Sequence, residues 1–156
     1  MFETSPNIST LVRRVILKEI MHQPPIILHV EDPFPMVEKT LRENRIKHLP
    51  IVDDSNKLVG IITLSDLYRT CAPRRRPDDG SFFYTYEQLD SFILRHVMSK
   101  DPQCLKPNNS LLDAMQMMVR GGLGCIPVVD DNRKLKGIVT QTDIVRVVTK
   151  LFDDKG

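Results

Sequence analysis

Residues Gly137 to Asp143 read GIVTQTD, and residues Gly60 to Asp66 read GIITLSD. In each string an apolar run typical of a β-strand ends at a threonine, and an aspartate follows three positions later. A threonine with an acidic residue at this spacing caps many helices that bind nothing. Because the string occurs twice in one chain, we interpret it as part of a repeated structural unit.

The repeat extends well beyond these two strings. Pro50 and Pro127 are separated by the same 77 positions as Gly60 and Gly137 (127 − 50 and 137 − 60). Around these anchors, HLPIVDDSNKLVGIITLSDLYR aligns with CIPVVDDNRKLKGIVTQTDIVR without a gap. Two copies of one supersecondary unit explain this self-similarity.

Each copy predicts an extended piece, a helix, two strands joined by a tight polar turn, and a second helix. The extended pieces and first helices are expected at 26–29 and 34–44, and at 104–106 and 111–120. The second helices should begin after Thr63 and Thr140. Neither copy is large enough to bury its sheet well alone, so the predicted fold class is α/β (α+β), with two β-α-β-β-α repeats packed as a pseudo-two-fold pair.

The same pattern divides the chain into five segments. They are an N-terminal helical extension (1–20), the first repeat (21–70), a linker with a loop and a helix (71–97), the second repeat (98–150) and a C-terminal tail (151–156). Helical periodicity predicts the leading helix at about residues 8–21. The helix at the end of the linker is expected to pack on the second repeat.

Composition points to an ordinary globular chain in a reducing compartment. The 156 residues carry 22 basic and 20 acidic side chains, and a net charge of +2 does not by itself indicate a nucleic-acid or membrane partner. The N-terminal residues lack the pattern of a secretory signal, and no apolar run is long enough for a membrane span. The three cysteines form no metal-binding or disulfide pattern, so the predicted location is the cytoplasm.

The paired strings, each preceded by a proline flanked by apolar residues and then by Val-Asp-Asp, resemble tandem CBS domains. The resemblance covers residues from about Met21 to Arg69 and from Met98 to Val148. It implies that the two repeats form a Bateman module, whose clefts between repeats bind adenosine-containing ligands such as AMP, ADP, ATP, NAD or S-adenosylmethionine. It also implies a free-standing module that forms a homodimer and regulates a protein partner.

The chemistry of the second string agrees with this implication. A strand that ends at Thr140 and turns directly into a helix leaves helix N–H groups unpaired, and such an end attracts phosphate. The hydroxyls of Thr140 and Thr142 add hydrogen-bond donors, and the Asp143 carboxylate can accept both vicinal hydroxyls of a ribose. Thr63, Ser65 and Asp66 are expected to form the corresponding site of the first string.

The two predicted sites differ in their basic residues. In similar modules, the phosphates held by one repeat also meet basic residues that precede the proline of the other repeat. The first repeat offers Lys47 and His48 there, whereas the second offers Gly124 and Cys125. Since a charge-assisted contact is roughly twice as strong as a neutral one, a phosphorylated nucleotide should prefer the Asp143 site. The alternative is that Lys47 and His48 belong to a solvated helix end.

Each of the other candidate residues has two possible roles. Leu49 and Ile126 are among the apolar residues on the elements that should line an adenine slot, although most such residues are also core residues. Arg69 and Arg146 follow the aspartates by three positions and either reach a polyphosphate or pair with the aspartate. The Arg74–Arg76 run either contacts nucleic acid or another protein, or belongs to a solvated loop, which Asp78 and Asp79 favour.

No nucleophile, phosphate-loop, dinucleotide-binding or metal motif is present, so no enzymatic activity and no required cofactor are predicted. The leading hypothesis is a regulatory module that senses an adenine nucleotide and transmits binding to a dimer or partner surface. The alternatives are a structural scaffold with degenerate sites and, less favoured, a nucleic-acid-binding protein.

Overall fold

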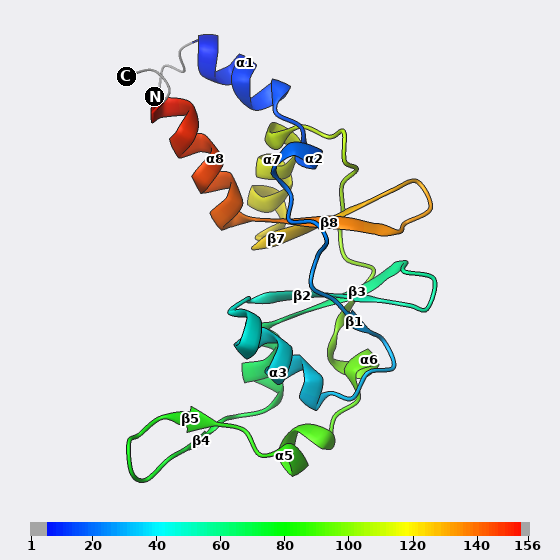
Figure 1. Ribbon diagram of the computed structural model, residues 1–156, viewed down its shortest axis with the longest axis vertical. Coiled ribbons are helices and arrows are strands. Elements are labelled where there is room, and N and C mark those ends of the chain that lie inside the picture. The colour runs from blue at the N-terminus through cyan, green and yellow to red at the C-terminus, as the bar shows by residue number, and fades with distance from the viewer. Residues whose placement is uncertain (1–5, 154–156) are drawn as a thin grey trace. The chain divides into compact units, whose positions relative to one another are not determined.

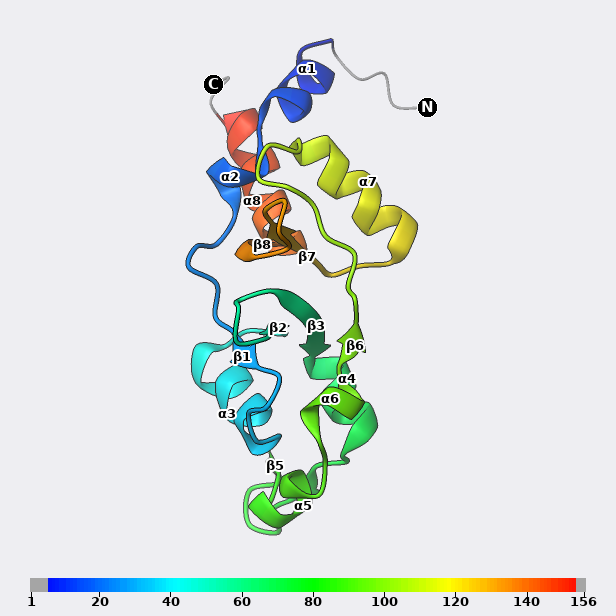
Figure 2. The ribbon, with the colours of Figure 1, turned by 90° about the vertical axis from the view of Figure 1, so that its right-hand side faces the viewer.

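The computed structural model describes residues 6–153 and divides the chain into two compact units. Unit 2 is Ile26–Pro102, and unit 1 combines the residues up to Pro25 with those from Gln103 onward. Figure 1 labels most of the helices and strands, and Figure 2 adds the labels of α4 and β6. The ends of the predicted N-terminal extension (1–5) and C-terminal tail (154–156) lie outside the described residues.

Unit 2 contains a four-stranded sheet with the order β1-β2-β3-β6. Its strands are β1 (Leu28–His29), β2 (His48–Val52), β3 (Leu58–Thr63) and β6 (Ser99–Lys100). Helices α3 (Pro35–Asn44) and α4 (Leu64–Thr70) are labelled in Figure 2. They supply Val37, Leu41 and Leu67 to the core of this unit. Strand β3 alternates buried and half-buried residues, as expected of a strand with one face on the core.

Unit 1 repeats this arrangement with shorter outer partners. Its elements are α7 (Leu111–Gly121), β7 (Cys125–Val129), β8 (Leu135–Thr140) and α8 (Gln141–Asp153). Leu105 forms a parallel bridge to β7, and His22 forms an antiparallel bridge to β8. These single-residue bridges lie where β1 and β6 lie in unit 2.

The pairing of the inner strands confirms the repeated unit. His48 lies opposite Thr63 in unit 2, and Cys125 lies opposite Thr140 in unit 1. Both hairpins have a register shift at the end of their first strand, next to Val52 and next to Val129. The predicted mixed α+β fold of two β-α-β-β-α repeats is therefore confirmed.

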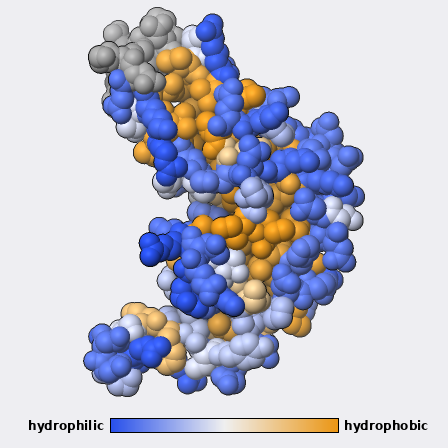
Figure 3. Space-filling view, in the orientation of Figure 1, coloured by the Kyte–Doolittle hydropathy of each residue, from blue (hydrophilic) through white to orange (hydrophobic). Residues whose placement is uncertain are grey.

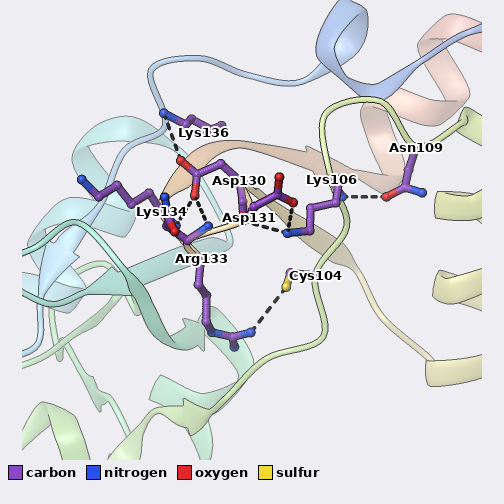
Figure 4. A network of polar contacts seen from close by, with 9 residues as sticks. Cys104, Lys106, Asn109, Asp130, Asp131, Arg133, Lys134 and Lys136 are labelled. Carbon is purple, nitrogen blue, oxygen red and sulfur yellow. Dashed lines mark hydrogen bonds and ion pairs between the residues drawn. The ribbon is translucent and has the colours of Figure 1, made fainter.

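The Val-Asp-Asp strings build the turns of the two hairpins. In unit 1 the Asp130 Oδ1 accepts backbone N–H groups from Asn132 and Lys134, both at 2.9 Å. In unit 2 Asp53 accepts the corresponding two N–H groups at 2.9 and 3.0 Å. Lys106 adds a contact of 2.9 Å from Nζ to the Asp130 carbonyl (Figure 4). The repeated aspartates thus have a structural role that is independent of any ligand.

Each sheet is completed by a segment that packs closely on a glycine. A Cβ atom on Gly137 would lie 2.6 Å from Met21 Sδ and 2.8 Å from the carbonyl oxygen of His22. A Cβ atom on Gly60 would lie 2.4 Å from Met98 Sδ. Glycine at position 137 allows the backbone of His22 to approach β8 closely, and the segment around Met21 belongs to unit 1 although the sequence repeat begins there.

The linker packs on the first repeat, so the prediction that its helix packs on the second repeat is wrong. It contains two short helices, α5 (Tyr86–Asp90) and α6 (Leu94–Val97), in place of one. Leu89 and Leu94 are buried in the core of unit 2, and the Phe92 ring lies 5.5 Å from the Phe34 ring. The apolar face of the linker is therefore used within its own unit.

The leading helix is also shorter than predicted. Helix α1 (Pro6–Arg14) ends before Ile16, and the short α2 (Leu17–Ile20) follows it. Ile16 has an extended backbone and bridges to Ser110. The N–H of Leu17 donates to the carbonyl of Asn109, and the carbonyl of Val15 accepts the N–H of Leu111, the first residue of α7. Tertiary hydrogen bonds thus interrupt the helical pattern.

The predicted loop after α4 is a small hairpin. Its strands are β4 (Arg74–Arg75) and β5 (Phe82–Phe83), paired antiparallel. The guanidinium of Arg76 lies 4.7 Å from the centre of the Phe83 ring, a cation–π contact that ties the turn to β5. Arg74, Arg75 and Arg76 are exposed, as the interpretation of this run as a solvated loop predicts.

The two glycine contacts generate a matched test of the fold. We predict that Gly137→Ala lowers the free energy of unfolding by about 2 kcal/mol, because the new methyl meets a backbone carbonyl that cannot move cheaply. Gly60→Ala should cost about 1 kcal/mol or less, because it meets only the flexible end of Met98. Denaturant unfolding followed by circular dichroism measures both, and a larger cost for Gly60→Ala contradicts the close packing of the Met21 segment.

Candidate functional site

The last residue of β8 and the first turn of α8 form a tightly bonded corner around Asp143. The Oδ2 atom of Asp143 accepts hydrogen bonds from the backbone N–H and the hydroxyl of Thr140, both at 2.8 Å. The backbone N–H of Asp143 donates in return to the Thr140 hydroxyl oxygen at 3.3 Å. This reciprocal arrangement caps the helix and holds the carboxylate in one orientation.

The second oxygen of the same carboxylate is bonded to two long side chains. Oδ1 lies 2.8 Å from His22 Nε2 and 3.1 Å from a guanidinium nitrogen of Arg146. The Asp143 side chain is 4% exposed, whereas the side chains of His22 and Arg146 are 63% and 56% exposed. Burial acts to raise the pKa of Asp143, but hydrogen bonds from Thr140 and the charge of His22 outweigh it, and the pKa is lowered. The carboxylate is thus buried and ionised, and its Oδ1 atom is bonded to two side chains that are largely exposed.

The corner of the first repeat has the same hydrogen bonds. Asp66 Oδ2 accepts from the N–H and hydroxyl of Thr63 at 2.8 Å each, and Arg69 pairs with Oδ1. The Asp66 side chain is 12% exposed, so this corner is more open than its counterpart. Ser65 and Thr142, the hydroxyl residues one position before each aspartate, are both exposed.

The prediction that the two arginines form ion pairs with the aspartates is confirmed. Arg69 and Arg146 each contact the aspartate three positions earlier on the same helix. Both arginines are largely exposed, so water can solvate each guanidinium when it leaves its carboxylate.

Lys47 and His48 lie beside the Thr63 corner within unit 2. The carbonyl of Lys47 accepts the N–H of Leu64 at 2.9 Å, and His48 pairs with Thr63 across the hairpin. Burial, followed by the charge of Lys47, lowers the pKa of His48. Their predicted contact with a ligand on the Thr140 corner joins residues of different units and stays a prediction.

The second repeat has a neutral pair at these positions, as the sequence indicates. The carbonyl of Gly124 accepts the N–H of Gln141 at 3.1 Å, and Cys125 pairs with Thr140. Burial raises the pKa of the Cys125 thiol to about 12, so this residue carries no charge near neutral pH. At these equivalent positions the first repeat therefore has a basic pair of residues, and the second repeat has a neutral pair.

Leu49 and Ile126 are completely buried in the cores of their units. Their side chains serve packing, and a ligand would reach these residues through their backbone groups. Their assignment to the ligand site stays a prediction.

His22 is the residue that the sequence patterns did not identify. It follows Met21 at the start of the first repeat, yet its side chain reaches the aspartate of the second repeat. The available signal was the 77-residue offset, which aligns His22 with Ser99 and so marks a difference between two otherwise similar segments. Nothing in the sequence alone shows that these segments pack on the sheets next to the corners.

Metal and membrane sites were also sought in the described part of the chain. Residues 6–153 contain no cluster of three or more histidine, cysteine, aspartate or glutamate side chains that could hold a metal ion. Within the same range, none of the helices is both long enough and apolar enough to cross a bilayer.

Comparison with known families assigns this architecture. The sequence matches the CBS domain at residues 17–72 and again at residues 94–150. The chain belongs to the CBS domain family. The predicted tandem CBS pair is confirmed, and the family supports a regulatory, ligand-binding module.

One relative of this chain is an enzyme that is much longer than the chain. The L-aspartate semialdehyde sulfurtransferase of Methanocaldococcus jannaschii is 30% identical over 132 residues, which are 85% of this chain and 23% of that protein. This chain thus spans about a quarter of that relative.

Two solved structures share the fold. The crystal structure of the CBS domain pair of protein MJ0100 in complex with 5′-methylthioadenosine and S-adenosyl-L-methionine is 29% identical, has a TM-score of 0.70, and matches 91% of this chain and 98% of that chain. The crystal structure of CBSX2 in complex with AMP is 22% identical, has a TM-score of 0.71, and matches 88% of this chain and 98% of the other.

The two corners predict different costs for losing the capping hydroxyl. Thr140→Ala should lower the free energy of unfolding by about 1–2 kcal/mol, because it removes both the cap and a donor to a buried carboxylate. Thr63→Ala should cost less, since water can reach the more exposed Asp66. Chemical denaturation at neutral pH compares the variants, and equal costs would contradict the difference in burial.

Acid should weaken the Asp143 corner in a defined direction. A carboxyl group whose pKa is lowered by folding stabilises the protein above its unfolded pKa of about 3.9, and this contribution is lost as the pH falls further. We expect Asp143→Asn to flatten the fall in stability of the wild type between about pH 5 and pH 2. Unfolding curves across this range measure the slope, and an unchanged slope would refute the assignment.

Proposed function

We propose that the protein is a regulatory module that binds an adenosine-containing ligand at the Thr140–Asp143 corner and transmits binding to a dimer or partner surface. The observation that supports this most is the state of the Asp143 carboxylate. Thr140 holds one carboxylate oxygen firmly, while the other oxygen is bonded to two exposed side chains that a ligand can displace. A vicinal diol of a ribose is a suitable replacement, because it offers two hydroxyl donors to one carboxylate.

The exposed hydroxyl of Thr142 and the beginning of α8 supply the rest of the site. Helix α8 has 13 residues, and its dipole favours an anionic group near its first turn. The proposed ligands are AMP, ADP or ATP, with NAD and S-adenosylmethionine as further members of the class. Lys47 and His48 would favour a phosphorylated member if they meet the ligand as family resemblance implies.

The nature of a related pair supports the adenosine class. The CBS pair that is 29% identical to this chain was crystallised with 5′-methylthioadenosine and S-adenosyl-L-methionine. Both compounds contain an adenosine group, and the ribose is the part of this group that would bond to the carboxylate. The proposed role of Asp143 is therefore independent of whether the ligand carries phosphate.

A ligand titration tests the proposal. We expect isothermal calorimetry with AMP, ADP, ATP, NAD, S-adenosylmethionine and 5′-methylthioadenosine to detect binding of at least one compound. Asp143→Ala should weaken that binding by at least about tenfold, which corresponds to about 1.4 kcal/mol for a lost charge-assisted contact. Asp66→Ala is the matched control, because it removes the same group from the other corner.

The result also separates the proposal from its main alternative. A structural scaffold is favoured by the fact that both Asp143 oxygens already have partners within the chain. Wild-type protein that binds no member of the ligand panel would support the scaffold and contradict the proposed function.

Exposed apolar residues on the helices support the interface of a homodimer as the surface that responds to the ligand. Val119 on α7 and Val145 on α8 are 84% and 65% exposed, and Figure 3 shows apolar surface beside these helices. Tyr68 on α4, which occupies the position of Val145 in the first repeat, is 53% exposed. Tyr68 and Val145 thus place a large apolar side chain at the same exposed helix position of each repeat.

Charge at this surface should dissociate the dimer. We predict that Val145→Glu converts the protein to a monomer in sedimentation equilibrium, because the buried carboxylate would lack a partner. Phe82→Glu on the β4–β5 hairpin is the control, since it alters an equally exposed apolar residue away from the repeat helices. A wild type that is already monomeric at all concentrations would exclude the homodimer.

A further inference from the structure

His22 holds a defined position on the second corner. Its backbone donates to the Ile138 carbonyl at 2.9 Å and accepts from the Ile138 N–H at 3.2 Å, which fixes the residue on the edge of β8. From this edge its Nε2 reaches Asp143 Oδ1 at 2.8 Å, while the ring remains largely in solvent. Since a carboxylate oxygen only accepts, this nitrogen carries the shared proton.

The first corner has no such group in the same place. Ser99 is the counterpart of His22 and pairs with Ile61 on β3. Among the side chains that the structure describes around Asp66, the bonded partners are Thr63 and Arg69. Because the arginine contact is common to both corners, the histidine is the feature that distinguishes them.

The Asp143 carboxylate has no spare acceptor site. An ionised carboxylate offers about four lone-pair directions. The N–H and hydroxyl of Thr140 occupy one oxygen, and His22 and Arg146 occupy the other. A ligand that places a diol on this carboxylate must therefore displace a donor that belongs to the protein.

We infer that His22 is an internal competitor for the Asp143 carboxylate, which weakens ligand binding at this corner and does so more strongly as the pH falls. The inference rests on the proposed function of that corner and adds a determinant of its affinity and pH response. Protonation of an imidazole adds a positive charge to a hydrogen bond whose acceptor is already a carboxylate, and this charge strengthens the contact. Histidine is the side chain whose charge ordinarily changes between about pH 5 and pH 8.

The other charged groups at the contact do not titrate in this range. Asp143 stays ionised, because its pKa is lowered from an already acidic value. Arg146, which shares Oδ1 with His22, keeps its charge throughout. His22 is therefore the one imidazole among the side chains that the structure shows bonded to Asp143.

The test uses 5′-methylthioadenosine, because it lacks phosphate. A nucleotide phosphate would change its own charge near pH 6 and obscure the effect. We expect calorimetry on the full chain to show several-fold weaker binding at about pH 5.5 than at about pH 8. His22→Ser, which installs the residue of the other repeat, should tighten binding at the lower pH and remove most of this dependence.

Two further variants keep the result interpretable. His22→Gln retains an N–H donor that does not titrate, so it should abolish the pH dependence even if it still competes. His29→Ser changes an exposed histidine of unit 2 and should leave the dependence as it is in the wild type.

The outcomes separate this inference from the function on which it rests. If only His22→Ser binds the ligand, or if this variant binds it more tightly than the wild type does, the competition is supported. Equal binding by wild type and His22→Ser at both pH values overturns the role of His22 and leaves the proposed function standing. If neither protein binds any ligand of the panel, the proposed function fails and this inference fails with it.

Discussion

The close packing of Met21 and Met98 on Gly137 and Gly60 determines much of this structure. Because neither glycine has a side chain, Met21 and Met98 can lie directly against the inner strands and complete the sheets. The same contact holds His22 beside β8, within reach of Asp143. A packing requirement in the core of each sheet thus decides which residues meet at the proposed ligand site.

The corners show why one motif can serve both stability and binding. Thr140 and Thr63 fix one oxygen of an aspartate and cap a helix, which is sufficient reason for the motif in a protein without ligands. The second oxygen is bonded to side chains that are largely exposed. Binding can therefore exchange these outer contacts without breaking the cap, and this separation between the two oxygens permits both roles.

The sequence predicted the repeated unit well, because strand pairing follows local patterns. A fixed offset aligned the prolines, glycines and aspartates, and the pairs His48–Thr63 and Cys125–Thr140 reproduce that offset in the hairpins. Long-range packing was less predictable. Ile16 interrupts the leading helix by bonding near Ser110, and the linker fills its own unit through residues such as Leu94. His22 was missed for the same reason, since only the folded sheet shows that it neighbours Asp143.

The central claim, that the strand-to-helix corner at Asp143 receives the sugar of an adenosine ligand, can be tested by amide NMR. With 5′-methylthioadenosine added to isotope-labelled protein, the account predicts concentrated chemical-shift changes at Thr140, Thr142 and Asp143 that disappear in Asp143→Ala. Shifts confined to other parts of the chain, or shifts that persist in this variant, would contradict it.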